Sequence, residues 1–197
     1  DFVHLHIHSE FSLLDGANRI KDLPVRAKEL GMDSIAITDH GVMFGVIDFY
    51  KACKANNVKP IIGCEVYVAP RTRFDKESNI DNKYYHLILI AKNVQGYKNL
   101  CYLTSLSYTE GMYYKPRIDE ELIRQYSEGL ICLTACVAGQ LPQLLLAGKD
   151  DEAEKMVQTY SEIFGKDHFY IELQKHGIDD EDRVAPKLVK IARKFDI

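Results

Sequence analysis

The sequence lacks features that would place it in several common classes of protein. No run approaches the roughly 18 apolar residues that a membrane-spanning helix needs, and no charged segment followed by an apolar run marks a secretory signal. Its five cysteines are odd in number and form no C-x-x-C pair, which disfavours a disulfide framework or a zinc ribbon. We therefore expect a soluble protein of the reducing cytoplasm, with no membrane partner.

The chain also has no excess of positive charge. With 25 Lys and Arg against 29 Asp and Glu, its formal net charge is −4, which argues against a free-standing nucleic-acid binder with a broad basic surface. Any contact with DNA would have to be local or be supplied by a partner. No internal repeat is evident, and 197 residues, 46% of them hydrophobic, favour one domain with one substantial core.

Histidines alternate with aliphatic residues at the start of the chain. The alternation of His4, His6 and His8 with single apolar residues predicts a β-strand with three imidazoles on one face. Buried neutral histidines need a hydrogen-bond partner for every ring nitrogen, and a metal ion would organise them. We therefore predict that His6 and His8 are metal ligands together with Asp15 in the following turn. His4 lies further back, and we expect a satisfied core histidine there.

Strands and helices alternate along the rest of the chain. Apolar periodicity predicts further strands over 34–38, 60–68, 85–91, 130–134 and 169–173, and helices over about 20–30, 46–56, 95–107, 139–147, 152–164 and 181–197. This alternation predicts an α/β fold with a parallel sheet and, at this length, a curved or barrel arrangement. The polar segment 71–83 is expected to be a mobile surface loop.

Candidate ligands lie near the ends of several of these strands. His40 and Cys136 come just after two strands, and Glu65 lies in the second half of another. Because the carboxyl ends of parallel strands meet at one edge, we expect these side chains to converge with Asp15. His86 is the exception, since it lies at the start of its strand. Either that strand begins earlier, or His86 approaches the site from another direction.

The candidate ligands outnumber those that a single tetrahedral zinc ion can use. They are His6, His8, Asp15, His40, Glu65, His86 and Cys136. We therefore predict two to three divalent ions, and zinc, manganese and iron all suit this donor set. Glu65 could bridge two ions, whereas Cys136 could instead be a small buried hydrophobic residue.

Such a cluster predicts hydrolysis of phosphoesters. Metal ions a few ångströms apart polarise a phosphoryl group and lower the pKa of a water molecule. The residues predicted to carry catalysis are His8, Asp15, His40 and Glu65. Aromatic and cationic residues also alternate over 111–117, where Tyr114, Lys115 and Arg117 could stack bases and touch phosphates of DNA. That segment could equally pack on the rim of a barrel.

These motifs resemble those of the PHP family, the polymerase and histidinol phosphatase family. The matching motifs are His6-x-His8, Asp15-Gly16, Thr38-Asp39-His40, Glu65, His86 and Cys136. The stretches 8–16, 37–45 and 114–117 further resemble the N-terminal region of bacterial DNA polymerase III alpha subunits. The resemblance implies a distorted TIM-like (β/α)7 barrel with a trinuclear metal site. It also implies a role in DNA replication, as a metal-dependent 3′–5′ exonuclease or as a docking module.

The resemblance implies further chain beyond residue 197. The family's last motif, an Asp-x-His on a seventh strand, has no counterpart in 1–197. We therefore expect a PHP domain truncated before its last strand, taken from a longer polymerase chain. Its expected partners are a DNA 3′ end, the remaining domains of the alpha subunit and a separate proofreading exonuclease subunit. The alternatives are an inactive structural or docking module of the polymerase and a free-standing phosphatase of the histidinol-phosphatase type.

Overall fold

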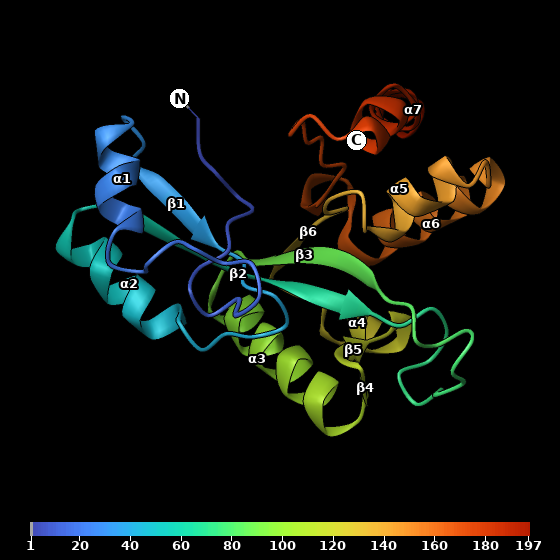
Figure 1. Cartoon of the computed structure of the whole chain (residues 1–197), viewed down its shortest axis with the longest axis horizontal. Helices are drawn as coiled ribbons and strands as arrows, with labels where there is room; N and C mark the ends of the chain where they lie inside the picture. The colour runs from blue at the N-terminus through green and yellow to red at the C-terminus, as the bar shows by residue number, and fades with distance from the viewer. Residues whose placement is uncertain (1) are drawn as a thin grey trace.

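One long strand, β2, organises the sheet. In the computed structural model, which describes residues 2–197, β2 spans Lys59–Val68 and pairs with three other strands (Figure 1). It is parallel to β1 (Ser34–Ile37) along its first half and to β5 (Lys115–Ile118) at its end. It is antiparallel to β3 (Tyr85–Ala91). The central strand therefore has neighbours of both orientations.

The remaining strands extend the sheet on both sides. β3 pairs antiparallel with β6 (Leu130–Leu133), which pairs parallel with β7 (Phe169–Tyr170). β4 (Met112–Tyr113) forms a short hairpin with β5. The prediction of a wholly parallel sheet is therefore wrong at β3. The physical reason is that the connection 69–84 contains no helix, so the chain turns back instead of making the crossover that a parallel neighbour requires.

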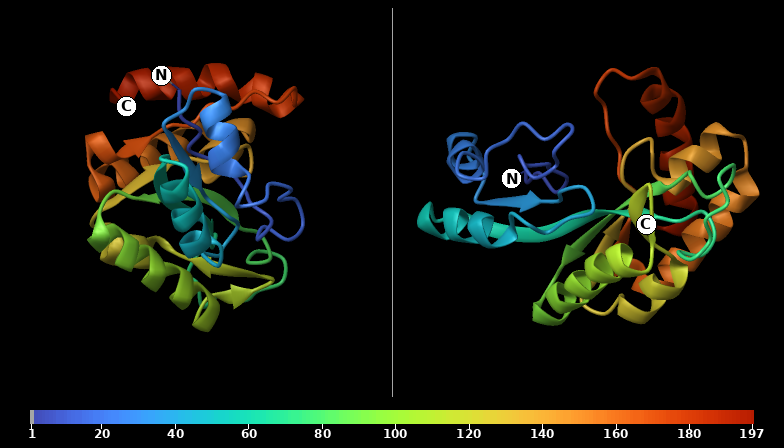
Figure 2. Two further views of the ribbon diagram at one scale, coloured as in Figure 1. Left: turned by 90° about the vertical axis from the view of Figure 1, so that its left-hand side faces the viewer. Right: turned by 60° about the horizontal axis from the view of Figure 1, so that its bottom comes forward.

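Helices cover the sheet at both ends. They are α1 (Leu23–Glu29), α2 (Val46–Ala55), α3 (Val94–Thr109), α4 (Glu120–Tyr126), α5 (Gln140–Leu146), α6 (Asp150–Phe164) and α7 (Asp179–Phe195), with a short 3-10 turn at Lys166–His168. Figures 1 and 2 show α1 and α2 at one end of the sheet and α5, α6 and α7 at the other. The predicted helices are all present, whereas α4 and the β4–β5 hairpin were not predicted. No helix within residues 2–197 is long and apolar enough to cross a membrane.

Two large hydrophobic cores result from this arrangement, beside a small third cluster around β3 and β6. The smaller lies between β1, α1 and α2, where Phe49 and Ala27 are fully buried. The larger joins β2, β3 and β6 to α3 through α7, with residues such as Leu89 and Leu103 at its centre. The sheet is thereby fixed between two helical groups, which leaves the ends of its central strands free to carry polar side chains.

The first seven described residues run beside β1 without forming a regular strand. The amide of Ala36 donates to the carbonyl of His4, and the amide of Thr38 donates to the carbonyl of Ile7. The predicted extended conformation is therefore present, as an irregular segment. His4 itself is exposed and its ring meets that of Phe2 edge to face. The prediction of a core histidine at this position is wrong, because nothing covers this end of the segment.

Arg117 anchors the loop that joins β2 to β3. Its side chain has no exposed surface, and its guanidinium donates hydrogen bonds to four backbone carbonyls, those of Gly111, Arg73, Asp75 and Asp81. The segment 71–83 is therefore tied to the sheet at three of its carbonyls, whereas the sequence predicted a mobile loop. Arg117 cannot contact DNA either, because its side chain is fully buried and four of its five donors bond inside the protein. This corrects its assignment as a DNA contact.

Replacing Arg117 with Met should destabilise the chain strongly. Each buried carbonyl that loses its donor costs about 1–3 kcal/mol, so the free energy of unfolding should fall by at least about 3 kcal/mol in urea denaturation. Arg124→Met is the matched control, because this exposed arginine pairs, among residues 2–197, only with Glu120 on the same helix and should cost less than about 1 kcal/mol. Similar small losses for both variants would contradict the anchoring role.

Candidate metal centre

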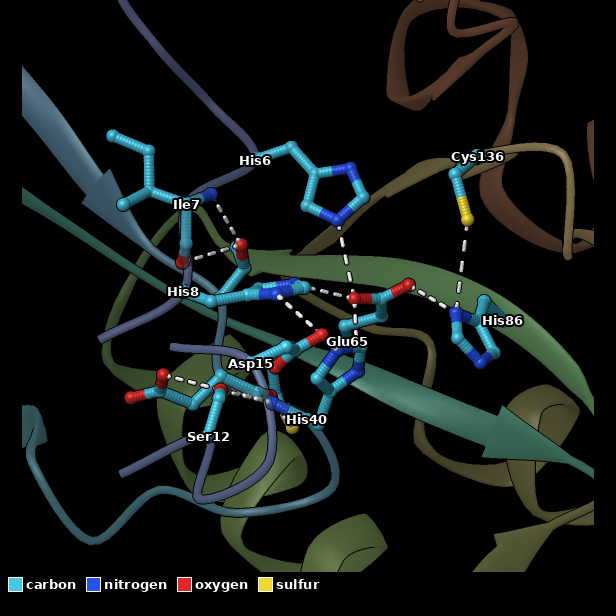
Figure 3. A network of polar contacts seen from close by, with 12 residues as sticks. His6, Ile7, His8, Ser12, Asp15, His40, Glu65, His86 and Cys136 are labelled. Atoms are coloured by element: carbon cyan, nitrogen blue, oxygen red, sulfur yellow. Dashed lines mark hydrogen bonds and ion pairs between the residues drawn. The ribbon is translucent and has the colours of Figure 1, made fainter. Parts of the chain in front are cut away.

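A fully buried carboxylate, that of Glu65 on β2, lies at the centre of the site (Figure 3). Its Oε2 atom lies 2.6 Å from His8 Nε2 and 3.1 Å from both His6 Nε2 and His40 Nδ1. Its Oε1 atom lies 2.6 Å from His86 Nδ1. One carboxylate thus joins four imidazoles from three segments of the chain. These five residues are called the His–Glu cluster below.

Asp15 and Cys136 lie at the margin of the His–Glu cluster. The Asp15 carboxylate is half-exposed, and its Oδ2 lies 3.0 Å from His40 Nε2 and 3.9 Å from His8 Nδ1. Cys136 Sγ lies 3.7 Å from His86 Nδ1, its one polar contact with the cluster among the described residues. The structure therefore brings all seven predicted ligands together. They line a solvent-open cavity of about 510 Å³.

The sheet explains how these side chains meet. His40 lies three residues after the end of β1 and forms an isolated parallel bridge with Glu65, so the two side chains are neighbours. His86 lies at the start of β3. Because β3 runs antiparallel to β2, its amino end lies at the edge where β1 and β2 reach their carboxyl ends. The antiparallel strand thus accounts for the unexpected position of His86 in the sequence.

A second buried carboxylate, that of Asp39, builds the loop 9–16. Asp39 accepts hydrogen bonds from the Ser9 amide at 2.6 Å, the Ser9 hydroxyl at 2.7 Å and the Ser12 hydroxyl at 2.7 Å. The loop closes tightly on itself at Gly16, where a Cβ atom would lie 1.8 Å from the carbonyl oxygen of Ser9. The Asp39 side chain therefore fixes the segment between two predicted ligands, while its backbone carbonyl accepts from the Glu65 amide.

The imidazoles hold the pKa of Glu65 well below its usual range. Burial alone would raise this pKa, but the contacts with His6, His8 and His86 outweigh burial. The carboxylate is therefore ionised throughout the physiological range. At His40 the balance is different, because burial lowers its pKa and the nearby Glu65 charge only partly offsets that effect.

Two imidazoles are stabilised in their protonated form. Burial would lower the pKa of His6, but Glu172 and Glu65 raise it to about 10. Burial also opposes protonation of His86, whereas Cys136 and Glu65 raise its pKa to about 9. At both histidines, the nearby negative charge favours the protonated imidazole by more than burial disfavours it.

Glu172 and Gln174 belong to the surroundings of the site, although the sequence analysis missed them. Glu172 Oε1 lies 2.8 Å from His6 Nδ1, and Gln174 Nε2 donates to the same oxygen at 2.7 Å. The ring of His6 is thus held between two carboxylates, with Nε2 directed at Glu65. The available signal was a single acidic residue within the otherwise apolar stretch 169–173.

The donor set fits divalent metal ions. Three buried polar atoms have no hydrogen-bond partner among residues 2–197, namely His40 Nδ1, Glu65 Oε1 and Glu172 Oε2. Two of these atoms nevertheless lie within ion-pair distance of a cluster atom, His40 Nδ1 next to Glu65 Oε2 and Glu65 Oε1 next to His86 Nδ1. Three groups have donor atoms within 4.8 Å of one another: His6, His8 and Glu65; His8, Asp15 and His40; and His40, Glu65 and His86. Imidazole and carboxylate donors at such spacing suit zinc, manganese or iron.

Two of the predicted DNA contacts remain near the site. Lys115 Nζ lies 5.2 Å from the centre of the Tyr67 ring, and Lys115 lines a cavity together with His40 and His86. Tyr114 is exposed next to it. Lys115 and Tyr114 are therefore accessible on the rim, in contrast to the buried Arg117.

The fold and the cluster together define a PHP domain. The chain matches the PHP domain family over residues 4–176 and belongs to that family. Over its whole length it is 55% identical to DNA polymerase III subunit alpha of Treponema pallidum and 50% identical to that of Borreliella burgdorferi. The chain spans 17% of the length of each of these relatives. The resemblance to the polymerase alpha subunits is thereby confirmed.

Solved structures confirm the fold class. A protein from Bifidobacterium adolescentis that is assigned as a metal-dependent phosphoesterase superposes with a TM-score of 0.60 at 12% identity, over 99% of this chain and 84% of that one. An amidohydrolase from Chromobacterium violaceum gives a TM-score of 0.57 at 12% identity and the same coverage. The α/β fold is therefore the distorted TIM-like arrangement that the resemblance implied, with β3 reversed.

Replacing Asp39 with Ala should loosen the loop 9–16. Three donors would lose a buried acceptor, so the free energy of unfolding should fall by about 1–3 kcal/mol, and amide hydrogen exchange over the loop should accelerate. Asp33→Ala is the control, because the exposed Asp33 side chain accepts from Ser34 alone within the described part of the chain. Unchanged exchange over 9–16 in the Asp39 variant would show that this carboxylate does not hold the loop.

Proposed function

We propose that this PHP domain belongs to a bacterial DNA polymerase III alpha subunit and hydrolyses DNA from its 3′ end. Its His–Glu cluster, with Asp15 and Cys136, would hold two or three divalent ions. The observation that carries the proposal is the buried Glu65 carboxylate surrounded by four imidazoles beside a solvent-open cavity. The high identity to polymerase alpha subunits supports DNA as the substrate. Such a protein would act in the cytoplasm, where bacterial DNA is replicated.

The geometry of Glu65 favours more than one ion. Its Oε2 atom is directed at three imidazoles, whereas Oε1 is directed at His86 alone. A carboxylate whose two oxygens face different imidazoles is arranged as a bridging ligand would be. Cys136 would supply a further ligand next to His86, and Asp15 would supply one next to His8 and His40.

The reaction is the hydrolysis of the last phosphodiester bond. Bound divalent ions would polarise the phosphoryl group and ease deprotonation of the attacking water. The water oxygen attacks phosphorus, the bond from phosphorus to the preceding O3′ breaks, and that O3′ takes up a proton. Asp15, half-exposed beside His40, is placed to accept the proton that the water loses. The products are a nucleoside 5′-monophosphate and a strand shortened by one nucleotide.

The remaining residues of the site would orient the histidines and hold the DNA strand. Glu65 would orient His8 and His40 through the contacts already described. Glu172 would fix the ring of His6 from the opposite side. Tyr114 and Lys115 would contact the DNA strand at the rim.

The same geometry favours a second candidate function, a structural or docking module. Ions held by Glu65 and four histidines would tie together four segments of the chain, which stabilises a fold whether or not DNA is hydrolysed. Because the chain spans 17% of its polymerase relatives, the remaining domains of the alpha subunit would be its partners, together with a separate proofreading exonuclease.

His8→Ala distinguishes the two candidates. The variant should lose stepwise shortening of a 5′-labelled single strand in Mn²⁺ while circular dichroism shows that it remains folded, although its melting temperature falls because Glu65 loses one of its four imidazoles. His168→Ala, outside the cluster and in contact with Lys92, should leave the digestion unchanged. A metal-loaded, folded chain that leaves DNA intact would contradict the exonuclease and support the docking module.

A further inference from the structure

A second cavity adjoins the His–Glu cluster. It has a volume of about 390 Å³, and Asp15, His40 and His86 line both this cavity and the one that contains Glu65. Its size lies in the range of about 300–1,000 Å³ that is usual for small-molecule pockets. The two cavities therefore share one wall, and a ligand in the second would lie directly beside the metal ligands.

The remaining walls of this cavity are largely aromatic. The ring of Tyr84 is parallel to that of His86, with centroids 6.0 Å apart, and the ring of Tyr67 is parallel to that of His40 at the same distance. The two tyrosines meet edge to face at 5.1 Å. An aromatic surface thus continues outward from the imidazoles of the cluster.

The rim of the cavity exposes large apolar side chains. Phe44 is 70% exposed, Leu13 89% and Leu14 91%, and none of the three belongs to the hydrophobic cores of the described chain. Adjacent exposed apolar residues beside a functional cluster are typical of a binding surface. These side chains therefore have no packing role that would account for their positions.

The polar groups of the cavity suit a phosphate but would not distinguish one base from another. Lys115 is the one lysine among its described lining residues, which include no Asn, Gln or Arg. The Asp15 carboxylate also lines the cavity and is paired with His40. The Ser12 hydroxyl already donates to Asp39. Side-chain amides and guanidinium groups are the usual readers of base edges. A planar base could therefore stack here whatever its identity, as in sequence-independent single-strand binding.

We propose that this second cavity binds the terminal nucleotide of a single-stranded nucleic acid. The base stacks on the aromatic wall that includes Tyr84 and Phe44, and the phosphate lies between Lys115 and the His–Glu cluster. All four bases bind with similar affinity. The inference deepens the proposed function, on which it rests, by assigning the part of the protein that holds the nucleotide to be released.

The absence of tryptophan from the chain allows a direct test by fluorescence. Phe44→Trp places a single reporter on the rim, and Tyr102→Trp, at an exposed position on α3 outside the cavity, is the matched control. Titration with dAMP, dCMP, dGMP and dTMP should quench the first reporter saturably, with dissociation constants within about fivefold of one another, and should leave the second unquenched. Inorganic phosphate alone should quench neither.

Removing the aromatic wall should weaken nucleotide binding. Adding Tyr84→Ala to the Phe44→Trp chain should raise the dissociation constants at least about fivefold, as expected for the loss of one stacking partner. In the unmodified background, Phe44→Ala should raise KM for 3′-end digestion with little change in kcat. Because the Phe44 side chain is exposed, the Phe44→Ala variant should fold as the unmodified chain does.

The outcomes separate this inference from the proposed hydrolysis. Digestion of 3′ ends without quenching of the Phe44→Trp reporter and with unchanged KM in Phe44→Ala would overturn the terminal-nucleotide cavity alone. The apolar rim would then be a surface for a protein partner. Saturable quenching in a metal-loaded chain that does not digest DNA would support the cavity and overturn the hydrolysis.

Discussion

The structure depends on the burial of one ionised carboxylate. An isolated charge in the protein interior costs several kcal/mol, and Glu65 has no exposed surface. Its charge is stabilised by four imidazoles that come from the N-terminal segment, the end of β1 and the start of β3. The fold and the site therefore depend on each other, because the carboxylate can be buried only when these segments bring their histidines to it.

The irregular features of the fold all bring side chains to the buried Glu65 carboxylate. The N-terminal segment runs beside β1 as far as Thr38, which brings two histidines over Glu65. Asp39 then closes the loop that returns Asp15 to the same place. The reversal of β3 delivers His86. From these imidazoles an aromatic surface extends into the neighbouring cavity, so that metal ligands and the proposed nucleotide site form one continuous wall.

The sequence predicted β1, β2, β3, β6 and β7 and most of the helices because their apolar periodicity is local, whereas it missed the β4–β5 hairpin. It also predicted that His40 and Glu65 would meet, since both lie near carboxyl ends of neighbouring parallel strands. The direction of β3 could have been inferred from the missing helix between residues 68 and 85, because only a helical crossover would have kept it parallel. The expectation of strict alternation concealed that signal, and with it the reason for the position of His86.

Other parts of the site depend on contacts that no local pattern records. The guanidinium of Arg117 donates hydrogen bonds to carbonyls up to 44 residues away. The alternation of cationic and aromatic residues over 111–117 therefore wrongly suggested a DNA contact for Arg117. Glu172 reaches His6 across 166 residues. His4 continues the pattern of His6 and His8, yet it is exposed because no element covers that end of the segment. Periodicity identifies which residues share a face, whereas burial of that face is a tertiary property.

The most direct test of this account is elemental analysis of the purified chain and of its Glu65→Gln variant after loading with divalent metal and removal of excess. The account predicts about two or three ions per folded chain, and a loss of at least one in the variant, since a neutral amide is a poor bridging ligand. Circular dichroism on the same samples would establish that both are folded. A folded, unmodified chain without bound metal would contradict the central role assigned to Glu65.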